Sequence, residues 1–277
     1  MIDYAYYNGV YTPYDDTVIP LSDRSFYFAD AVYEVMLGRC GKVHNLALHL
    51  QRLESNAKSI GIEYSLSEDE LLTILDTLTS LAELDTYVVY IQLSGNSQRR
   101  THIRSSGRSN LLITLTHTEI PKDAEPISAI TLPDRRYDYC NLKTTNLLPA
   151  VLSMKSAQHT GCDIAIFHNN GIITECSHAN IFILNGMTLA TPPLSSRILP
   201  GITRAELIRF APKKGIRVQE REIRLDELQS ADAILITSTT HFLRICTKVD
   251  STTCNVNNIA IASELFALLR EDFENNT

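Results

Sequence analysis

Three Asn-Gly dipeptides between runs of β-forming residues constrain the fold of this 277-residue chain more than any other feature. They are Asn8-Gly9, Asn170-Gly171 and Asn185-Gly186. Asn-Gly is a strong short-range signal for a tight hairpin, because both residues tolerate positive φ angles. Strands joined by such turns are antiparallel, which argues against a doubly wound parallel sheet. The chain also has no GxGxxG after a strand and no GxxxxGK[ST], so neither a Rossmann nor a P-loop site is expected.

Helical patterns interrupt these strands irregularly. Residues 46–62 carry apolar side chains three or four positions apart, which predicts an amphipathic helix, and Ser67 with Glu70 forms a capping box before a second helix. Residues 121–128 are polar and contain two prolines, as is typical of a linker. The pattern predicts an α+β fold with two domains: an N-terminal domain over 1–120, a linker over 121–128, and a C-terminal domain over 129–277.

Composition excludes several classes of function. A net charge of −7 argues against nucleic acid as a partner. The six cysteines are scattered without metal-ligand or CxxC spacing, so no metal site is predicted, and free thiols suit a reducing cytoplasm. No basic start with an apolar segment follows Met1, and no uncharged apolar run approaches the roughly 20 residues of a membrane span. We therefore expect a soluble, cytoplasmic protein without a membrane segment.

Lys143 is the first candidate for chemistry. It lies in YCNLKTTNLL, residues 139–148, which holds no other charged residue. In an apolar site the pKa of a lysine falls, and the neutral amine becomes a nucleophile that condenses with a carbonyl group. The alternative is a lysine that reaches solvent or pairs with Asp134 or Asp138.

Glu175 is the second candidate, because it ends an apolar strand in GIITECSHANIFIL. A buried carboxylate needs a partner, and a protonated ring nitrogen or backbone amides would serve. The alternative is an ordinary acid at the end of a strand.

Three stretches could bind a phosphate. In LPGITRAELIRFA, Gly201 lies just before a helix and Thr203 is its expected N-cap, where free amides form an anion site. Alternatively, Thr203 and Glu206 only form a capping box. Residues 235–240, LITSTT, end a buried strand in hydroxyl groups that either cradle an anion or complete a turn. Arg52 is either a phosphate fork or a solvated helix residue.

Taken together, these candidate residues indicate one cofactor. A lysine for an imine, an acid for a ring nitrogen, and an arginine with a helix N-terminus for a phosphate are what pyridoxal phosphate requires. The cofactor would act as an electron sink, and Glu175 would strengthen it by keeping the ring nitrogen protonated.

From about residue 5 to about 250 the chain resembles the fold-type IV pyridoxal-phosphate enzymes. This family includes D-amino-acid and branched-chain aminotransferases and aminodeoxychorismate lyase. The resemblance rests on several motifs in one order: DRSFYFADAVYEV, HLQRLESNA, LKTTNLLPAVL, TECSHANIF, LPGITR and TSTT.

The resemblance assigns a role to each candidate. It implies that Lys143 forms the Schiff base with the cofactor and that Glu175 binds the pyridine nitrogen. It implies an active site between the two domains that a second subunit completes, and hence a homodimer. Leu199 would pack against the cofactor ring. The residues implied to bind the cofactor phosphate are Arg52, Ile202, Thr203, Ser238 and Thr239.

QRRTH, residues 98–102, resembles the R-x-H element with which D-amino-acid aminotransferases hold the substrate α-carboxylate. Arg100 and His102 would form this element across the dimer, and Tyr33 would assist. The alternative is a basic, solvated loop. The chain departs from the family at Cys176, His178 and Ala179, where small hydroxyl residues are usual, and it has no Trp.

The expected activity is transamination of D-amino acids, such as D-alanine or D-glutamate, with a 2-oxo acid acceptor in a ping-pong mechanism. Lys143 would act as Schiff base and as proton shuttle. The alternatives are an L-branched-chain aminotransferase and an aminodeoxychorismate lyase of the same fold. A non-catalytic protein that has kept the fold is the alternative from a different class.

Overall fold

The fold is taken from a computed structural model of the protein, whose described residues are 3–277. The described chain forms two compact units. The first contains the chain as far as Ile120, with Leu142–Asn146 and Asn275–Thr277, and the second contains Pro121–Asn141 and Leu147–Glu274. Lys143 thus clusters with the first unit, whereas the sequence assigned it to the C-terminal domain. The expected linker, 121–128, also differs, because a strand begins at Pro126. Residues 1–2 of the expected N-terminal domain lie outside the described residues.

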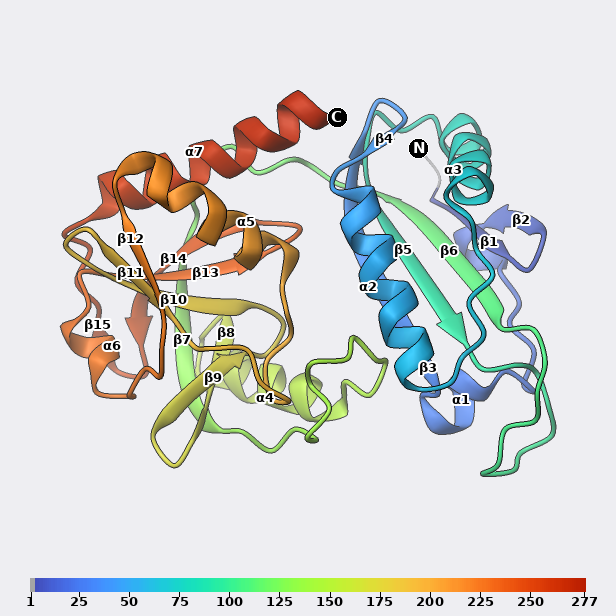
Figure 1. Ribbon diagram of the computed structural model, residues 1–277, viewed down its shortest axis with the longest axis horizontal. Helices are drawn as coiled ribbons and strands as arrows, with labels where there is room; N and C mark the ends of the chain where they lie inside the picture. Colours follow the sequence, from blue (N-terminus) through green and yellow to red (C-terminus); the bar gives the residue numbers. More distant parts are fainter. Residues whose placement is uncertain (1–2) are drawn as a thin grey trace. The chain divides into compact units, whose positions relative to one another are not determined.

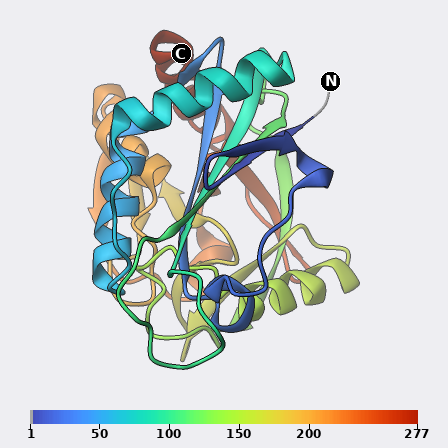
Figure 2. The ribbon, with the colours of Figure 1, turned by 90° about the vertical axis from the view of Figure 1, so that its right-hand side faces the viewer.

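The first unit is built on a six-stranded sheet in the order β2-β1-β6-β5-β3-β4, with antiparallel neighbours throughout. Figure 1 shows helix α2 lying along this sheet, and Figure 2 shows α3 crossing its end. The elements of this unit are β1 (Tyr4–Tyr7), β2 (Val10–Pro13), the 3-10 helix η1 (Tyr14–Asp16), α1 (Arg24–Phe28), β3 (Ala31–Arg39), β4 (Lys42–Val43), α2 (Leu46–Ser59), α3 (Glu68–Ala82), β5 (Thr86–Ser94) and β6 (Asn110–His117).

Local sequence explains most of these elements. Asn8 and Gly9 have φ angles of 47° and 97°, so the first Asn-Gly turn adopts the positive φ values that a tight hairpin needs. Ser67 caps α3 by accepting a hydrogen bond of 3.1 Å from the amide of Glu70. The apolar stripes of α2 and α3, including Leu53 and Leu78, are buried against the sheet in one core. The predicted Asn8-Gly9 turn and the Ser67 cap are confirmed, and the first amphipathic helix is present but ends at Ser59 rather than at residue 62.

The second unit is built on a nine-stranded mixed sheet in the order β12-β11-β10-β13-β14-β7-β8-β9, with β15 paired to β14. Its elements are β7 (Pro126–Pro133), α4 (Leu148–His159), β8 (Ile164–Asn169), β9 (Ile172–Cys176), β10 (Asn180–Asn185), β11 (Thr188–Thr191), α5 (Ile202–Phe210), the 3-10 helix η2 (Ala211–Lys214), β12 (Arg217–Glu220), α6 (Glu227–Ser230), β13 (Ala233–Ser238), β14 (Phe242–Val249), β15 (Thr252–Thr253) and α7 (Ile259–Asn276).

Isoleucine-rich strands fill the core of this unit. Ile166, Ile181, Ile234 and Ile236 come from three of the strands and are at most 1% exposed. Such β-branched residues pack well on the face of a pleated sheet. The sheet ends near Cys176 and Ser238, and these ends position the candidate residues of this unit.

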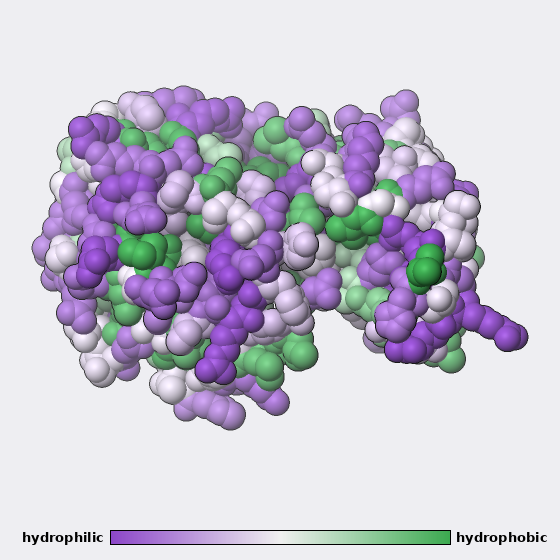
Figure 3. Space-filling model, turned by 60° about the horizontal axis from the view of Figure 1, so that its bottom comes forward, coloured by the Kyte–Doolittle hydropathy of each residue, from purple (hydrophilic) through white to green (hydrophobic). Residues whose placement is uncertain are grey.

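No helix within residues 3–277 is long and apolar enough to cross a lipid bilayer. Hydrophilic side chains dominate the face drawn in Figure 3, with hydrophobic side chains scattered among them.

Candidate active site

The Lys143 segment extends the sheet of the first unit. The amide of Tyr33 donates to the Lys143 carbonyl at 2.9 Å, and the amide of Thr145 donates to the carbonyl of Ala31 at 3.1 Å. Lys143 is half-buried, and its Nζ lies 4.2 Å from the centroid of the Tyr33 ring, which itself stacks on Tyr90. Hydrogen bonds to the backbone around β3 therefore hold the main chain of Lys143 in place, and the amine of Lys143 lies over the face of the Tyr33 ring.

The two acids considered as partners of Lys143 bind arginines of the second unit. Arg136 donates to both oxygens of Asp134, from Nε at 3.0 Å and from Nη2 at 2.8 Å. Arg197 lies 2.7 Å from Asp138. Each acid therefore has a cation of its own.

Arg52 belongs to a buried charge network in the first unit. It donates to Glu34 from Nε at 2.6 Å and from Nη2 at 2.8 Å, and His49 donates from Nδ1 at 2.7 Å to the same carboxylate. Burial alone would raise the pKa of Glu34, but the hydrogen bonds from Arg52 and His49 outweigh it and lower the pKa to about 2. Arg52 is thus rigidly oriented, as a phosphate-binding arginine must be.

Arg100 and His102 lie on an exposed loop of the first unit. The Arg100 guanidinium lies 5.3 Å from the centroid of Phe28, and the His102 ring lies 5.4 Å from the same ring. Arg24 donates from Nη1 to the carbonyl of Thr101 at 2.6 Å, which pins the loop between them. These contacts with Phe28 and Arg24 hold the loop in a defined conformation.

Glu175 lies at the end of β9 in the second unit and is 5% exposed. Its Oε2 accepts from Asn180 Nδ2 and from the Leu199 amide, both at 3.0 Å, and its Oε1 accepts from Arg136 Nη1. Burial raises the pKa of Glu175 to about 7, although Arg136 and the Leu199 amide oppose the rise. The carboxyl group is thus oriented by three donors and titrates near neutrality.

Arg136, which donates to Glu175, is a candidate residue of the second unit that the sequence analysis missed. It joins Glu175 to Asp134, whose side chain is fully buried and which also accepts from Thr174 at 2.9 Å. The dipeptide Arg135-Arg136 looks like surface charge in the sequence. The local signal was the spacing of Asp134 and Arg136, two residues apart, on which the bidentate pair is built.

The start of α5 differs in detail from the prediction. Its N-cap is Gly201 and no side chain caps it, so Thr203 lies inside the helix rather than at its N-cap. A Cβ at Gly201 would lie 2.0 Å from Asn180 Oδ1, so only glycine allows this close approach. Ile202 and Thr203 are both buried in the first turn, where backbone amides favour an anion.

The hydroxyl groups near the end of β13 also support an anion site in the second unit. Thr237 Oγ1 and Ser238 Oγ are buried, and no described residue hydrogen-bonds to them. Thr239 follows in the turn and is half-buried. Buried hydroxyl groups and the amides of a glycine-capped helix can donate to the phosphate of pyridoxal phosphate, and a buried carboxylate can accept from its protonated ring nitrogen.

The predicted residues thus divide between the units. Tyr33, Arg52, Arg100, His102 and Lys143 belong to the first unit, and Glu175, Leu199, Ile202, Thr203, Ser238 and Thr239 belong to the second. At the departures from the family pattern, Cys176 is buried, Ala179 is buried, and His178 is exposed beside Ser177 at 3.2 Å.

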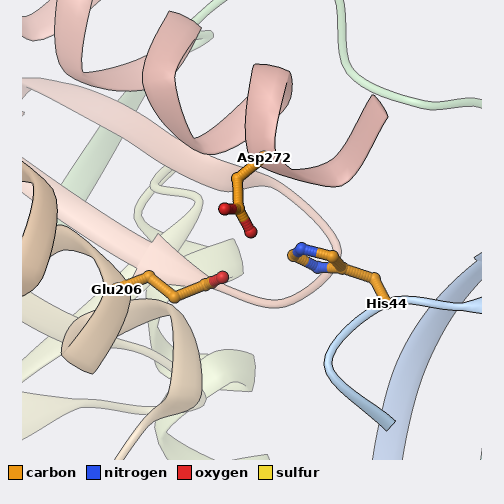
Figure 4. A group of neighbouring side chains, drawn as sticks. All are labelled: His44, Glu206 and Asp272. Atoms are coloured by element: carbon orange, nitrogen blue, oxygen red, sulfur yellow. The ribbon is translucent and has the colours of Figure 1, made fainter. Parts of the chain in front are cut away.

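Two further acids lie together in the second unit. Glu206 on α5 and Asp272 on α7 have carboxylate oxygens within 4.8 Å of each other (Figure 4). Arg209 lies 3.8 Å from Asp272 and offsets part of the negative charge. His44, which Figure 4 also draws, belongs to the first unit. Two carboxylates of one unit do not by themselves make a metal site.

Comparison with known proteins identifies the family. The model of the amino-transferase class IV family matches residues 31–249. Because this match covers most of the chain, the protein belongs to the class IV aminotransferases, and it is a transaminase that depends on pyridoxal phosphate. The expected fold-type IV α+β architecture is confirmed.

The relatives carry several activities. The chain is 30% identical over 250 residues to a D-alanine aminotransferase of Bacillus licheniformis, across 89% of this chain and 88% of the relative. A solved, provisionally assigned 4-amino-4-deoxychorismate lyase of Legionella pneumophila has a TM-score of 0.85 and 27% identity, over 92% of this chain and 96% of its own. A branched-chain aminotransferase of Thermoproteus uzoniensis has a TM-score of 0.87 at 22% identity, over 98% and 96%, and shares the fold.

Proposed function

We propose that the protein transfers the amino group of D-amino acids to a 2-oxo acid. The observation that supports this proposal is the loop on which Arg100 and His102 both lie close to the ring of Phe28. A guanidinium and an imidazole on one loop would suit a carboxylate, because the guanidinium can bind both oxygens of the carboxylate. The similarity to D-alanine aminotransferases supports the D-specific assignment.

The chain's own residues divide the work of the reaction. Pyridoxal phosphate, when bound, supplies the carbonyl group that accepts the amine and the electron sink that acidifies the α-proton. Lys143 would hold the cofactor and then move the α-proton as general base and acid. Glu175 would hold the proton of the ring nitrogen, and Arg136 keeps that carboxylate in place.

A guanidinium, backbone amides and hydroxyl groups would together bind the cofactor phosphate. Arg52, fixed by Glu34, would supply a guanidinium. The first turn of α5, at Ile202 and Thr203, would supply amides. Ser238 and Thr239 would supply hydroxyl groups to the phosphate.

Other residues would contact the cofactor ring and the substrate. Leu199 would pack against the ring, and Tyr33, which lies against the Lys143 amine, would assist in orienting the substrate.

We also infer a cytoplasmic homodimer in which a second copy supplies the carboxylate trap. Arg100 and His102 are exposed, as side chains offered to another copy must be. Helix α4 exposes Leu148, Val151 and Leu152 by 64%, 55% and 54%, which is a partly apolar surface for a partner of the same sequence. Six free cysteines are typical of a reducing compartment.

The test compares amino donors. With 2-oxoglutarate as acceptor, the enzyme should form pyruvate from D-alanine, and Arg100→Gln should raise the KM for D-alanine about tenfold or more. Arg99→Gln, an exposed neighbour in the same loop, should behave as the unmodified enzyme. Rapid turnover of L-leucine with no turnover of any D-amino acid would contradict the proposal.

A lyase is the second candidate, because the Legionella structure covers nearly the whole chain. Such an enzyme releases pyruvate from aminodeoxychorismate without an amino acceptor. Pyruvate formation from that compound in the absence of a 2-oxo acid, with no amino transfer from D-alanine, would favour it.

A further inference from the structure

Arg24, the first residue of α1, holds the loop between β5 and β6, which carries Arg100 and His102. Its guanidinium donates from Nη1 to the carbonyl of Thr101 at 2.6 Å and from Nη2 to the carbonyl of His102 at 3.2 Å. It also donates from Nε to Asp30 Oδ2 at 2.6 Å, and Arg24 is 5% exposed. One buried guanidinium therefore fixes the main chain directly after Arg100.

Asp30 accepts from a second arginine, which lies on the same loop. Arg104 donates from Nη1 to Asp30 Oδ1 at 2.7 Å and from Nη2 to the carbonyl of Ile60 at 2.7 Å. The amide of Gly95 donates to the Asp30 carbonyl at 2.9 Å. Arg24, Asp30 and Arg104 form the Asp30 cluster. The loop is therefore bound to this cluster near its start, in its middle and again at Arg104.

The Asp30 cluster is packed against a glycine that leaves no room for a side chain. A Cβ at Gly95 would lie 2.9 Å from Asp30 Oδ2. It would also lie 3.0 Å from Arg104 Cδ and 3.1 Å from Arg24 Cδ. The aliphatic parts of both arginines therefore fill the space beside the first residue of the loop, and the cluster has little freedom to rearrange.

Helix α1, which carries Arg24, is itself bound to the two strands that the loop connects. Its N-cap, Asp23, is 1% exposed and accepts from the amide of Ser25 at 2.9 Å. Asp23 Oδ2 accepts from Ser94 Oγ at 2.9 Å, at the end of β5, and from Asn110 Nδ2 at 3.1 Å, at the start of β6. The backbone position of Arg24 is therefore fixed independently of the loop.

Such bonds matter because of the length of the loop. Residues 95–109 contain no helix or strand, and a loop of this length is ordinarily mobile. A mobile loop has to be ordered when it binds a ligand, and this cost reduces the affinity. The bonds to Arg24 form within the protein alone, so they lower the cost before a substrate arrives.

We propose that Arg24, held by Asp30, is a positioning residue that sets the affinity for carboxylate substrates. The inference rests on the proposed function, in which Arg100 and His102 bind the substrate α-carboxylate. Arg24 acts through the main chain of the loop and not through the substrate. Amino donors and 2-oxo acid acceptors both carry this carboxylate, so the affinities for both depend on Arg24 to the same extent.

Steady-state kinetics with D-alanine and 2-oxoglutarate test the proposal. In Arg24→Gln both KM values should rise about tenfold or more, whereas kcat should stay within about threefold. Arg24→Lys keeps the charge beside Asp30 without the planar fork and should recover part of the loss. Arg108→Gln is the matched control, because the Arg108 side chain lies on the same loop and is 77% exposed, and both KM values should stay unchanged.

A double-mutant cycle separates positioning from a general loss of stability. In a protein that already carries Arg100→Gln and His102→Ala, Arg24→Gln should change either KM by about twofold or less, because the groups that it positions are absent. An equal rise in KM in both backgrounds would overturn the proposal. Asp30→Asn keeps the shape of the side chain and should also raise both KM values. If Arg24→Gln does not fold, unchanged KM values in Arg24→Lys and Asp30→Asn would overturn the proposal.

Hydrogen exchange distinguishes failure of this inference from failure of the proposed function. In the holoenzyme without substrate, amides of residues 95–109 should exchange about tenfold faster or more in Arg24→Gln, and those of α3 should not change. Absence of turnover with every D-amino acid would refute the proposed function, while loop exchange would still report on Arg24. Unchanged loop exchange would refute only the role of Arg24.

Discussion

Arg136 binds Oε1 of Glu175 although 39 residues of chain separate them, and the same guanidinium holds both oxygens of Asp134. Proximity to these two acids raises the pKa of Arg136, even though burial opposes the rise. Arg136 is therefore a fixed positive charge beside the carboxyl group that would hold the cofactor's ring nitrogen. Burial raises the pKa of Glu175, and the Arg136 guanidinium limits that rise.

Arg136→Gln should weaken cofactor binding near pH 7. The pKa of Glu175 is about 7 with Arg136 present, and loss of the guanidinium moves it higher, so less of the carboxylate form remains. Each pKa unit corresponds to about tenfold in the ionised fraction. The cofactor dissociation constant, followed by absorbance at pH 7 and pH 9, should rise about tenfold at pH 7 and recover at pH 9.

Arg135→Gln is the matched control, because Arg135 is exposed and adjacent. Its cofactor affinity should equal that of the unmodified protein. Equal affinities for Arg136→Gln and Arg135→Gln at pH 7 would show that Arg136 does not determine the ionisation of Glu175.

Glu34→Gln should lower the free energy of unfolding by about 3 kcal/mol, because it leaves Arg52 buried without its carboxylate. Denaturant titration measures the loss. Glu54→Gln, which removes the exposed Glu54–Lys58 pair on the same helix, should cost about 0.5 kcal/mol or less. Similar losses in the two variants would contradict a structural role for the buried network.

The same carboxyl group predicts acid sensitivity. The pKa of Glu34 is lowered to about 2 in the folded protein, so its contribution to stability is complete above its unfolded pKa. The contribution is lost as the pH falls from about 4.5 towards 2. Stability of the unmodified protein should therefore decline more steeply than that of Glu34→Gln in this range, as measured by urea titration at several pH values. Parallel declines would argue against the low pKa.

Lys143→Ala should reduce turnover about 100-fold or more, since it removes the proposed general base. Amino transfer from the best donor measures this effect, and absorbance near the visible edge would report loss of the cofactor linkage. Lys155→Ala, on the exposed side of α4, should leave turnover unchanged. Comparable turnover in the two variants would exclude Lys143 from the reaction.

The apolar surface of α4 predicts a self-association site. Val151→Glu should shift the protein from dimer to monomer, because it places a charge in an apolar interface. Light scattering after size-exclusion chromatography measures the mass. Leu72→Glu, on the partly exposed surface of α3, should not change the mass, and an unchanged mass for Val151→Glu would place the interface elsewhere.

The sequence by itself determined the elements whose causes are local. The Asn8-Gly9 turn, the Ser67 cap and the apolar stripe of α2 each depend on residues within one turn or one helix, so their chemistry is visible in the chain. The family's motifs likewise identified Lys143 and Glu175 as candidates. Pattern alone misplaced Thr203, because the sequence cannot tell which of two neighbouring residues begins a helix.

Only the tertiary structure decided which charges meet. Arg52 on α2 donates to Glu34 on β3, and Arg136 donates to Glu175, which lies 39 positions later in the chain. The carbonyl of Lys143 accepts from the amide of Tyr33 on β3, which lies much earlier in the chain. The way in which distant strands come together determines which charged side chains are buried and which of them have a partner. It therefore determines whether a charge is solvated, paired or left to bind a ligand.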